Sequence, residues 1–517
     1  MRLSRPTPFC VAALLGLSLA LPAARAAEPG KNPWFLAGQE AVAKAAGGAP
    51  IPHAKNAILF IGDGMGIATV TAARIYEGQS HGASGEENLL SFETLPYTAL
   101  SKTYTVDFQV GESSGTMTAM MTGIKTRSGV LGIDDSAARG DFAKAPAAAV
   151  PTLLERAADR GLWTGVVTTT TVTHATPGGC YAHTPERNWE NDSQLSPGAR
   201  AAGFPDIARQ LVEFSHGDGL QVAMGGGRAG FLPAPAGARR DGRDLVAEWQ
   251  KRHPDGRYAS DRSTLLEVDG EKVHHLLGLF SPEHMSFESE RAQSAGDQPS
   301  LSEMTAKAIE VLSRSPKGFV LMVEGGRIDH GHHAGNAYRA LTETVEFANA
   351  IKLALAKTNP AETLIVVTAD HSHTLTISGY PKRGNPILGL VVGSIGEGAP
   401  SDEPVKDLTG HPYTTLNYAN GPGYAGKSDA EPEGSKLYPH RPTKFGPATQ
   451  GRPDLTSTRA QDPNYLQESV VPLSAETHGG EDVPIYAGGP GALLFHGVQE
   501  QNFVFHAIAA ALGLPTP

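Results

Sequence analysis

The chain has 517 residues, of which 40% are apolar and 19% are charged, and its net charge is −11. This composition is typical of a globular protein. The negative charge argues against a nucleic-acid partner, because such a partner needs cationic side chains to neutralise its phosphates. The length is sufficient for one large domain with an insertion, or for two domains.

The N-terminal residues are predicted to be a secretion signal. Basic residues precede an apolar stretch over residues 9–22, and Ala24-Arg25-Ala26 fits a signal-peptidase site. We expect residues 1–26 to be removed and residues 27–517 to form the mature protein, in the periplasm or outside a bacterial cell. The apolar stretch is shorter than the about 20 residues that cross a bilayer, so we expect no membrane anchor.

Short apolar runs alternate with helical patterns along the chain. The predicted strands are Asn56–Ile61, Leu162–Thr168, Gly219–Met224, Phe319–Val323 and Thr363–Thr368. The predicted helices are Met117–Thr122, Val150–Arg160, Ser302–Ser313, Ala337–Lys357 and a packed C-terminal helix within Phe503–Leu514. This alternation predicts an α/β fold in which helices cover both faces of a mostly parallel central sheet.

Two stretches lack this periodicity. Residues from about 379 to 473 are rich in Gly, Pro, Asn and Asp, which predicts a loop-rich inserted subdomain. Scattered Tyr and Leu residues favour partial order over disorder there. We also expect residues 233–267 to be irregular.

Acidic and histidine residues follow several predicted strands. Asp63 comes after the first strand, Glu324 after the fourth, and Asp370 and His371 after the fifth. Because ligands of open α/β sheets gather at the carboxyl ends of the strands, we expect these side chains to lie close together.

Three segments combine carboxylates with histidines, at residues 324–333, 370–373 and 476–482. Such groups are costly to bury without a cation. Imidazole with carboxylate suits zinc, and carboxylate with hydroxyl suits magnesium. One such segment alone could equally be a solvated polar loop, but three at predicted strand ends favour a metal centre.

Ser113 precedes a predicted helix, where backbone N–H groups favour an anion. A helix cap is the alternative explanation. Gly111-Glu112-Ser113-Ser114-Gly115 matches the letters of Gly-x-Ser-x-Gly. No predicted strand leads into it, as a nucleophile elbow requires, so a Ser-His-Asp hydrolase is not indicated. A serine beside metal ions needs no histidine base.

Taken together, these motifs resemble the alkaline phosphatase family, from about residue 56 to about residue 506. The similarity is closer to the animal type than to the other bacterial branch, notably at His174 and His330. The segments that carry it are Ile61–Gly66, the residues around Ser113, His174–Pro177, Tyr181–Thr184, Arg187–Trp189, Val323–His333, Thr368–His373 and Thr477–Asp482.

The resemblance implies hydrolysis of phosphate monoesters of broad specificity through a phosphoserine on Ser113, with Arg187 clamping the phosphate. It implies two Zn²⁺ ions and one Mg²⁺ ion. The ligands would be Asp329, His333 and His478 for the first zinc, Asp63, Asp370, His371 and Ser113 for the second, and Asp63, Thr176 and Glu324 for magnesium. His174 would stand near the magnesium, and His330 would lie just outside the ligands. The family also favours homodimers, in which a crown-like insertion such as residues 379–473 helps build the interface.

Glu112 departs from the family, since animal enzymes have Asp before the serine. We expect Glu112 to pair with Arg187, and the competing interpretation is an acid that only faces the helix dipole. A phosphodiesterase or sulfatase on the same scaffold is an alternative function. Arg187 and the missing sulfatase motif around Ser113 argue against it, and the complete ligand set argues against a non-catalytic binding protein.

Overall fold

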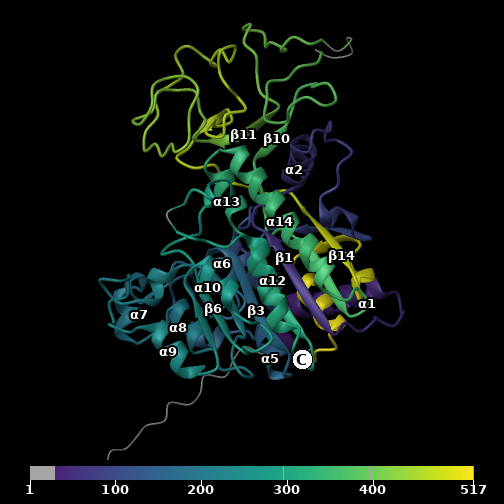
Figure 1. Ribbon diagram of the computed structural model, residues 1–517, viewed down its shortest axis with the longest axis vertical. Coiled ribbons are helices and arrows are strands. Elements are labelled where there is room, and N and C mark those ends of the chain that lie inside the picture. The colour runs from purple at the N-terminus through teal and green to yellow at the C-terminus, as the bar shows by residue number, and fades with distance from the viewer. Residues whose placement is uncertain (1–28, 295, 395–398, 400, 516–517) are drawn as a thin grey trace, which may run out of the picture.

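The computed structural model describes residues 29–294, 296–394, 399 and 401–515. The predicted signal peptide, residues 1–26, lies outside the described residues. The centre of the molecule is a ten-stranded sheet with the strand order β15-β2-β14-β8-β1-β7-β3-β4-β6-β5 (Figure 1). Its strands are β1 Asn56–Gly62, β2 Tyr97–Lys102, β3 Trp163–Thr171, β4 Val222–Gly226, β5 Arg257–Ala259, β6 Leu276–Leu279, β7 Phe319–Gly325, β8 Thr363–Thr368, β14 Val483–Gly488 and β15 Gly497–Glu500.

The sheet is mostly parallel, as the sequence predicts. Only β14 runs antiparallel to its two neighbours, β2 and β8. All five predicted strands are present, with ends that differ by up to three residues from the predicted bounds.

The helices form layers on both faces of this sheet. They are α1 Pro33–Ala46, α2 Ile67–Ser80, α3 Ser113–Thr122, α4 Ala145–Ala148, α5 Leu153–Asp159, α6 Ala175–Gly178, α7 Pro197–Ala201, α8 Ile207–Val212, α9 Leu245–Arg252, α10 Arg262–Glu267, α11 Glu288–Arg291, α12 Leu301–Leu312, α13 Arg327–His333, α14 Ala337–Lys357 and α15 Phe503–Ala511. None of the helices in the described part of the chain combines the length and apolarity needed to cross a membrane.

Strand β1 shows why two layers form. Leu59 and Ile61 pack into one hydrophobic core with α1, α3, α5 and α15, whereas Ile58 and Phe60 pack into another core with α2, α12 and α14. Successive side chains of a strand point to opposite faces, so a continuously apolar strand must be covered on both. Figure 1 shows α12 and α14 lying across one face.

The expectation that residues 233–267 are irregular is wrong. They contain α9, β5 and α10. Helix α9 buries Leu245, Val246 and Trp249 on one side and begins at Asp244, whose side chain accepts a hydrogen bond from the N–H of Ala247. Leu245, Val246 and Trp249 do have helical spacing, but the pattern covers only about two turns and lies among charged residues, and the prediction misses it.

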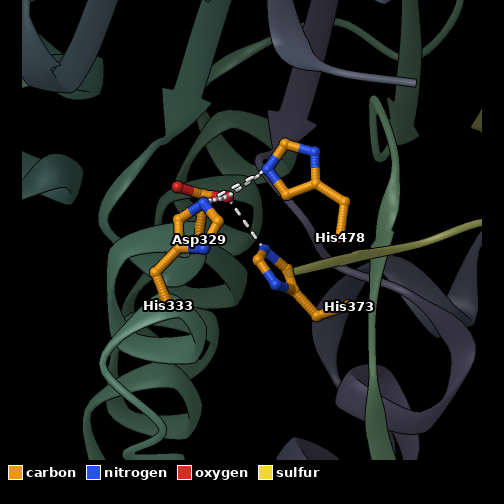
Figure 2. Close-up of side chains that lie close together, drawn as sticks. All are labelled: Asp329, His333, His373 and His478. Carbon is orange, nitrogen blue, oxygen red and sulfur yellow. Dashed lines mark hydrogen bonds and ion pairs between the residues drawn. The ribbon is translucent and has the colours of Figure 1, made fainter. Parts of the chain in front are cut away.

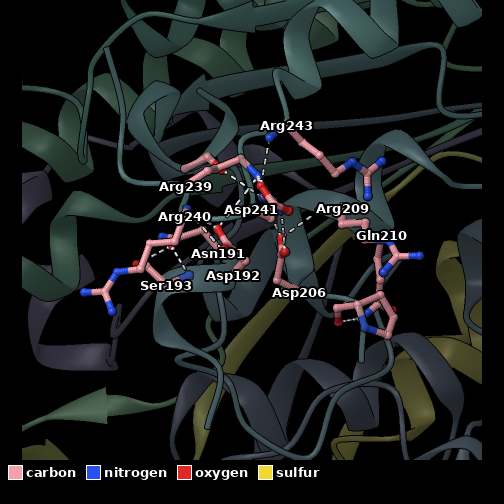
Figure 3. A network of polar contacts seen from close by, with 12 residues as sticks. Asn191, Asp192, Ser193, Asp206, Arg209, Gln210, Arg239, Arg240, Asp241 and Arg243 are labelled. Carbon is pink, nitrogen blue, oxygen red and sulfur yellow. Dashed lines mark hydrogen bonds and ion pairs between the residues drawn. The ribbon is translucent and has the colours of Figure 1, made fainter. Parts of the chain in front are cut away.

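A buried arginine joins this region to α8. The Arg239 side chain is 0% exposed and lies 2.9 Å from Asp206, 2.6 Å from Asp241 and 3.8 Å from Asp192 (Figure 3). Asp206 also caps α8 by accepting a hydrogen bond from the N–H of Arg209. The charge of Arg239 therefore compensates for carboxylates that would be costly to bury alone.

The described part of residues 379–473 consists mostly of loops and turns, as the sequence predicts. It contributes β11 Leu416–Gly421 and β12 Ser469–Pro472 to a small three-stranded sheet with β10 Leu375–Ile377. Figure 1 shows these loops at the top of the molecule, beyond α13 and one end of α14. A separate two-stranded ladder pairs β9 Ser372–His373 with β13 His478–Gly479.

Candidate metal and phosphate site

The predicted strand-end residues lie at one edge of the sheet. β1 pairs with both β7 and β8, so that Ile61 is opposite Glu324 on one side and Thr368 on the other. Asp63 directly follows β1, and Asp370 comes two residues after β8 ends. The side chains of Asp63, Glu324 and Asp370 are fully buried. The prediction that these carboxylates converge is confirmed.

Three imidazoles surround the carboxylate of Asp329 (Figure 2). Asp329 Oδ1 lies 2.8 Å from Nε2 of His373, 3.2 Å from Nε2 of His333 and 3.4 Å from Nε2 of His478. Helix α13 places Asp329 and His333 one turn apart on the same face. The β9–β13 ladder sets His373 directly opposite His478. We call these four residues the Asp329 group.

The hydrogen bonds of His333 and His478 determine which ring nitrogen is free. Nδ1 of His333 lies 2.5 Å from the carbonyl oxygen of Glu476, and Nδ1 of His478 lies 2.9 Å from that of Gly111. A carbonyl oxygen only accepts, so both rings carry their proton on Nδ1. Their Nε2 lone pairs then face each other at 3.2 Å. This is the orientation of histidines that share a cation.

His373 differs because both of its nitrogens face carboxylates. Nδ1 lies 2.5 Å from Glu476 Oε2, and Nε2 lies 2.8 Å from Asp329 Oδ1. Burial lowers the pKa of His373, but Glu476 and Asp329 together raise it to about 10. A ring protonated on both nitrogens has no lone pair for a cation, so His373 supports Asp329. The sequence assigns no role to His373 or Glu476, because their contact depends on the β9–β13 pairing.

A second group, the Asp63 group, consists of Asp63, Asp370 and His371. His371 Nε2 lies 3.4 Å from Asp63 Oδ1 and 3.3 Å from Asp370 Oδ2. These two oxygens are buried and have no hydrogen-bond partner among the described residues. Burial, together with the neighbouring Asp370, raises the pKa of Asp63 well above its usual value. Buried carboxylates with free oxygens beside an imidazole fit a bound cation.

Glu324 lies among hydroxyl groups. Its Oε2 accepts a hydrogen bond from Thr168 and one of 3.1 Å from Thr170, both on β3, and its Oε1 is without a partner in the described part of the chain. Thr176 Oγ1 lies 3.5 Å from Asp63 Oδ2. Burial raises the pKa of Glu324 to about 7. This oxygen-rich set suits magnesium. The sequence did not single out Thr168 or Thr170, because threonine is common inside strands.

Ser113 and Arg187 adjoin these groups. Ser113 is the first residue of α3, its side chain is buried, and its Oγ lies 3.4 Å from His371 Nε2. Arg187 lies between two partners, with Nη1 2.5 Å from Glu112 Oε2 and Nη2 3.0 Å from His174 Nε2. The guanidinium is thus held from two sides.

The expected pairing of Glu112 with Arg187 is present, so the interpretation that Glu112 only faces the helix dipole is wrong. Besides pairing with Arg187, its carboxylate caps α3 by accepting hydrogen bonds from the N–H groups of Ser114 at 3.0 Å and Gly115 at 2.9 Å. The cap and the arginine contact therefore depend on the same side chain.

His174 lies near Glu324, and His330 lies 4.0 Å from Asp329. Asp63, His174 and Glu324 each have a potential ligand atom within 4.8 Å of the others. The His330 ring lies 5.9 Å from the His174 ring and 4.5 Å from that of His284, a residue that the sequence did not single out.

A sequence model of the alkaline phosphatase family matches residues 54–514. The chain belongs to the alkaline phosphatase family. It is 43% identical over 472 residues to "Alkaline phosphatase" of Gadus morhua, which covers 89% of this chain and 91% of that protein. It is also 43% identical over 473 residues to the tissue-nonspecific isozyme of Gallus gallus, covering 89% of this chain and 84% of that protein.

Solved alkaline phosphatase structures share the fold. The enzyme of Thermus thermophilus matches with a TM-score of 0.63 and 25% identity, over 91% of this chain and 94% of that one. The enzyme of the Antarctic bacterium TAB5 matches with a TM-score of 0.58 and 23% identity, over 90% of this chain and 100% of that one. As a member of the alkaline phosphatase family, the chain is a phosphomonoesterase, and its clusters of histidine and aspartate fit the divalent metals that the family uses.

Proposed function

We propose that this chain hydrolyses phosphate monoesters through a phosphoserine on Ser113, with two Zn²⁺ ions and one Mg²⁺ ion bound. The observation that carries this proposal is the position of Ser113 Oγ, 3.4 Å from His371 in the Asp63 group. When bound, the metal ions would stabilise the deprotonated oxygen of Ser113, polarise the phosphate and stabilise negative charge on the leaving oxygen, which favours both attack and departure.

The chemistry of the donor atoms supports an assignment of ligands. Asp329, His333 and His478 would hold one zinc, on the side of the leaving group. Asp63, Asp370 and His371, with Ser113, would hold the other, and Asp63, Thr176 and Glu324 would hold magnesium. Imidazole and carboxylate favour zinc, whereas an all-oxygen set favours magnesium.

The protein's own residues carry the rest of the reaction. Ser113 Oγ attacks phosphorus, the bond to the leaving alcohol breaks, and the alcohol departs with a proton. Water then attacks the phosphoserine, which releases phosphate and restores the Ser113 hydroxyl. Arg187 would hold two phosphate oxygens through its planar fork, which a lysine cannot reproduce. Glu112 and His174 keep that fork in place.

Three further properties belong to the same proposal. Residues 1–26 would be a signal peptide that directs the protein to the periplasm or the exterior, and residues 379–473 would be a crown-like inserted subdomain. The chain would act as a homodimer. The resemblance to the family, which favours homodimers, is the ground for this part of the proposal.

A substrate comparison before and after chelation tests the proposal. We expect the purified protein to hydrolyse p-nitrophenyl phosphate far faster than bis-p-nitrophenyl phosphate, to lose activity on chelation, and to regain it with zinc and magnesium together. A preference for the diester would favour a phosphodiesterase instead. Full activity after complete metal removal would rule out the metal-dependent reaction.

A further inference from the structure

A pocket of about 520 Å³ opens beside the Asp329 group. His330 and His333 of α13 line one side, and residues 438–443 of the insertion line the other. Its volume lies within the range of small-molecule sites in proteins. The insertion thus forms a wall of a cavity that reaches the proposed leaving-group side of the reaction centre.

The lining of this pocket is positively charged or neutral. Within the described part of the chain it includes two arginines and four histidines and no carboxylate. The whole chain, by contrast, has a net charge of −11. A cavity without acids in an acidic protein concentrates positive potential and attracts anions.

Arg327, which is partly buried, supplies one positive charge of the lining. Its guanidinium lies 3.8 Å from the centre of the Phe287 ring, and Nη1 lies 2.7 Å from His330 Nδ1. Its Nε is buried and has no hydrogen-bond partner among the described residues. The carboxyl group that most affects it is that of Glu343, whose pKa is raised to about 8 by burial. Burial thus reduces the ionisation of Glu343 at neutral pH, so this carboxyl offsets the Arg327 charge only in part.

Arg441 supplies the other positive charge of the lining. It is exposed on the insertion, and in the part of the chain that the structure describes its side chain makes no ion pair. Tyr438 and Phe287, whose ring centres are 6.3 Å apart, add apolar surface to the same lining. The pocket combines room for an organic group with two arginine side chains in its lining.

We propose that this pocket receives the leaving group of the substrate and favours phosphate monoesters whose leaving group carries a second anionic group, a carboxylate or another phosphate. The inference rests on the proposed function, because it places the leaving group next to His333. Arg441 is then a specificity-determining residue contributed by the insertion.

Matched substrate pairs test this inference at pH 7.0. The carboxylate pair is 3-phosphoglycerate and glycerol 3-phosphate, and the phosphate pair is propane-1,3-diol bisphosphate and propane-1,3-diol monophosphate. We expect the wild type to have the higher kcat/KM for the anionic member of at least one pair. The ratio should fall about tenfold in Arg441→Glu, which reverses one charge at the pocket. The pair that responds shows which anion the pocket takes.

Arg459→Glu is the control, because Arg459 is an exposed arginine of the insertion that lines a different cavity. This control should leave the ratio unchanged. Equal kcat/KM for both members of both pairs in the wild type would overturn the inference, as would equal effects of the two variants or an unchanged ratio in Arg441→Glu. Absence of hydrolysis of all four monoesters would instead count against the proposed function itself.

Discussion

Substitution of Glu112 tests quantitatively how far one carboxylate stabilises the fold and holds Arg187, because this carboxylate both caps α3 and pairs with Arg187. It accepts hydrogen bonds from the N–H groups of Ser114, Gly115 and Gly129, and its Oε2 lies 2.5 Å from Arg187. Burial alone would raise the pKa of Glu112, but Arg187, the Ser114 hydroxyl and the backbone N–H groups outweigh it and lower the pKa from 4.5 to about 2. The side chain is 19% exposed, so solvent screens this interaction only partly.

The contribution of Glu112 to the free energy of unfolding follows from this shift of its pKa. A pKa lowered by this amount corresponds to about 3 kcal/mol of folding free energy from the ionised carboxylate, at about 1.4 kcal/mol per unit. This is more than the about 1 kcal/mol usual for an ion pair at an open surface. Because the folded pKa is depressed, the contribution is fully present above the unfolded value near 4.5 and is lost as the pH falls toward 2.

The variant Glu112→Gln keeps the shape of the side chain and removes its charge. We expect it to lower the free energy of unfolding by about 2–3 kcal/mol at pH 7 and less at pH 3, measured by urea denaturation. It should also weaken inhibition by free phosphate, because Arg187 loses a partner, while kcat stays within about tenfold of wild type.

Asp244→Asn is the matched control, since Asp244 caps α9 with one hydrogen bond from the N–H of Ala247 and pairs with no arginine among the residues that the structure describes. Asp244→Asn should lower the free energy of unfolding by at most about 1 kcal/mol and leave inhibition by phosphate unchanged. If Glu112→Gln cost no more than this control and kept the wild-type inhibition constant, the reasoning about the shared carboxylate would be refuted.

Three other predictions concern stability. Arg239→Ala leaves buried carboxylates unpaired and should lower the free energy of unfolding, measured in urea, by about 3–5 kcal/mol. Arg240→Ala, at the exposed neighbouring residue, should lower it by less than about 0.5 kcal/mol. Equal losses in the two variants would contradict this. Burial lowers the pKa of His183, but Glu155, 2.8 Å away, outweighs burial and raises the pKa above its usual value. The protonated His183 therefore stabilises the fold fully below about pH 6.5, and this stabilisation is lost as the pH rises through the pKa of the folded state. His183→Gln should therefore lower the thermal midpoint more at pH 6 than at pH 10, and a cost independent of pH would argue against the charged pair. Chelation should lower the midpoint of the wild type, because bound metals add to folding free energy, and an unchanged midpoint would speak against structural coupling of the metals.

The sequence predicts best what depends on the sheet. The sequence alone predicts that Asp63, Glu324 and Asp370 lie close together, because the carboxyl ends of parallel strands meet at one edge of the sheet. It does not predict the contact of His373 with Glu476, because that contact depends on a ladder between two segments about a hundred residues apart.

Short or capped elements were also difficult to predict. The helical spacing of Leu245, Val246 and Trp249 in α9 is a local signal, but it is short and lies among charged residues. The carboxylate of Glu112, by contrast, gains the Gly129 contact only when a distant turn folds against α3. That contact is tertiary, and no local pattern encodes it.

The most direct test of the central claim is to trap the enzyme with labelled inorganic phosphate at acid pH and to map the label. The account predicts label on Ser113 in the wild type and none in Ser113→Ala. Ser114→Ala should still carry the label on Ser113, because the Ser114 hydroxyl bonds to Glu112, whereas the Ser113 hydroxyl faces His371. Label on another residue, or label retained in Ser113→Ala, would contradict it.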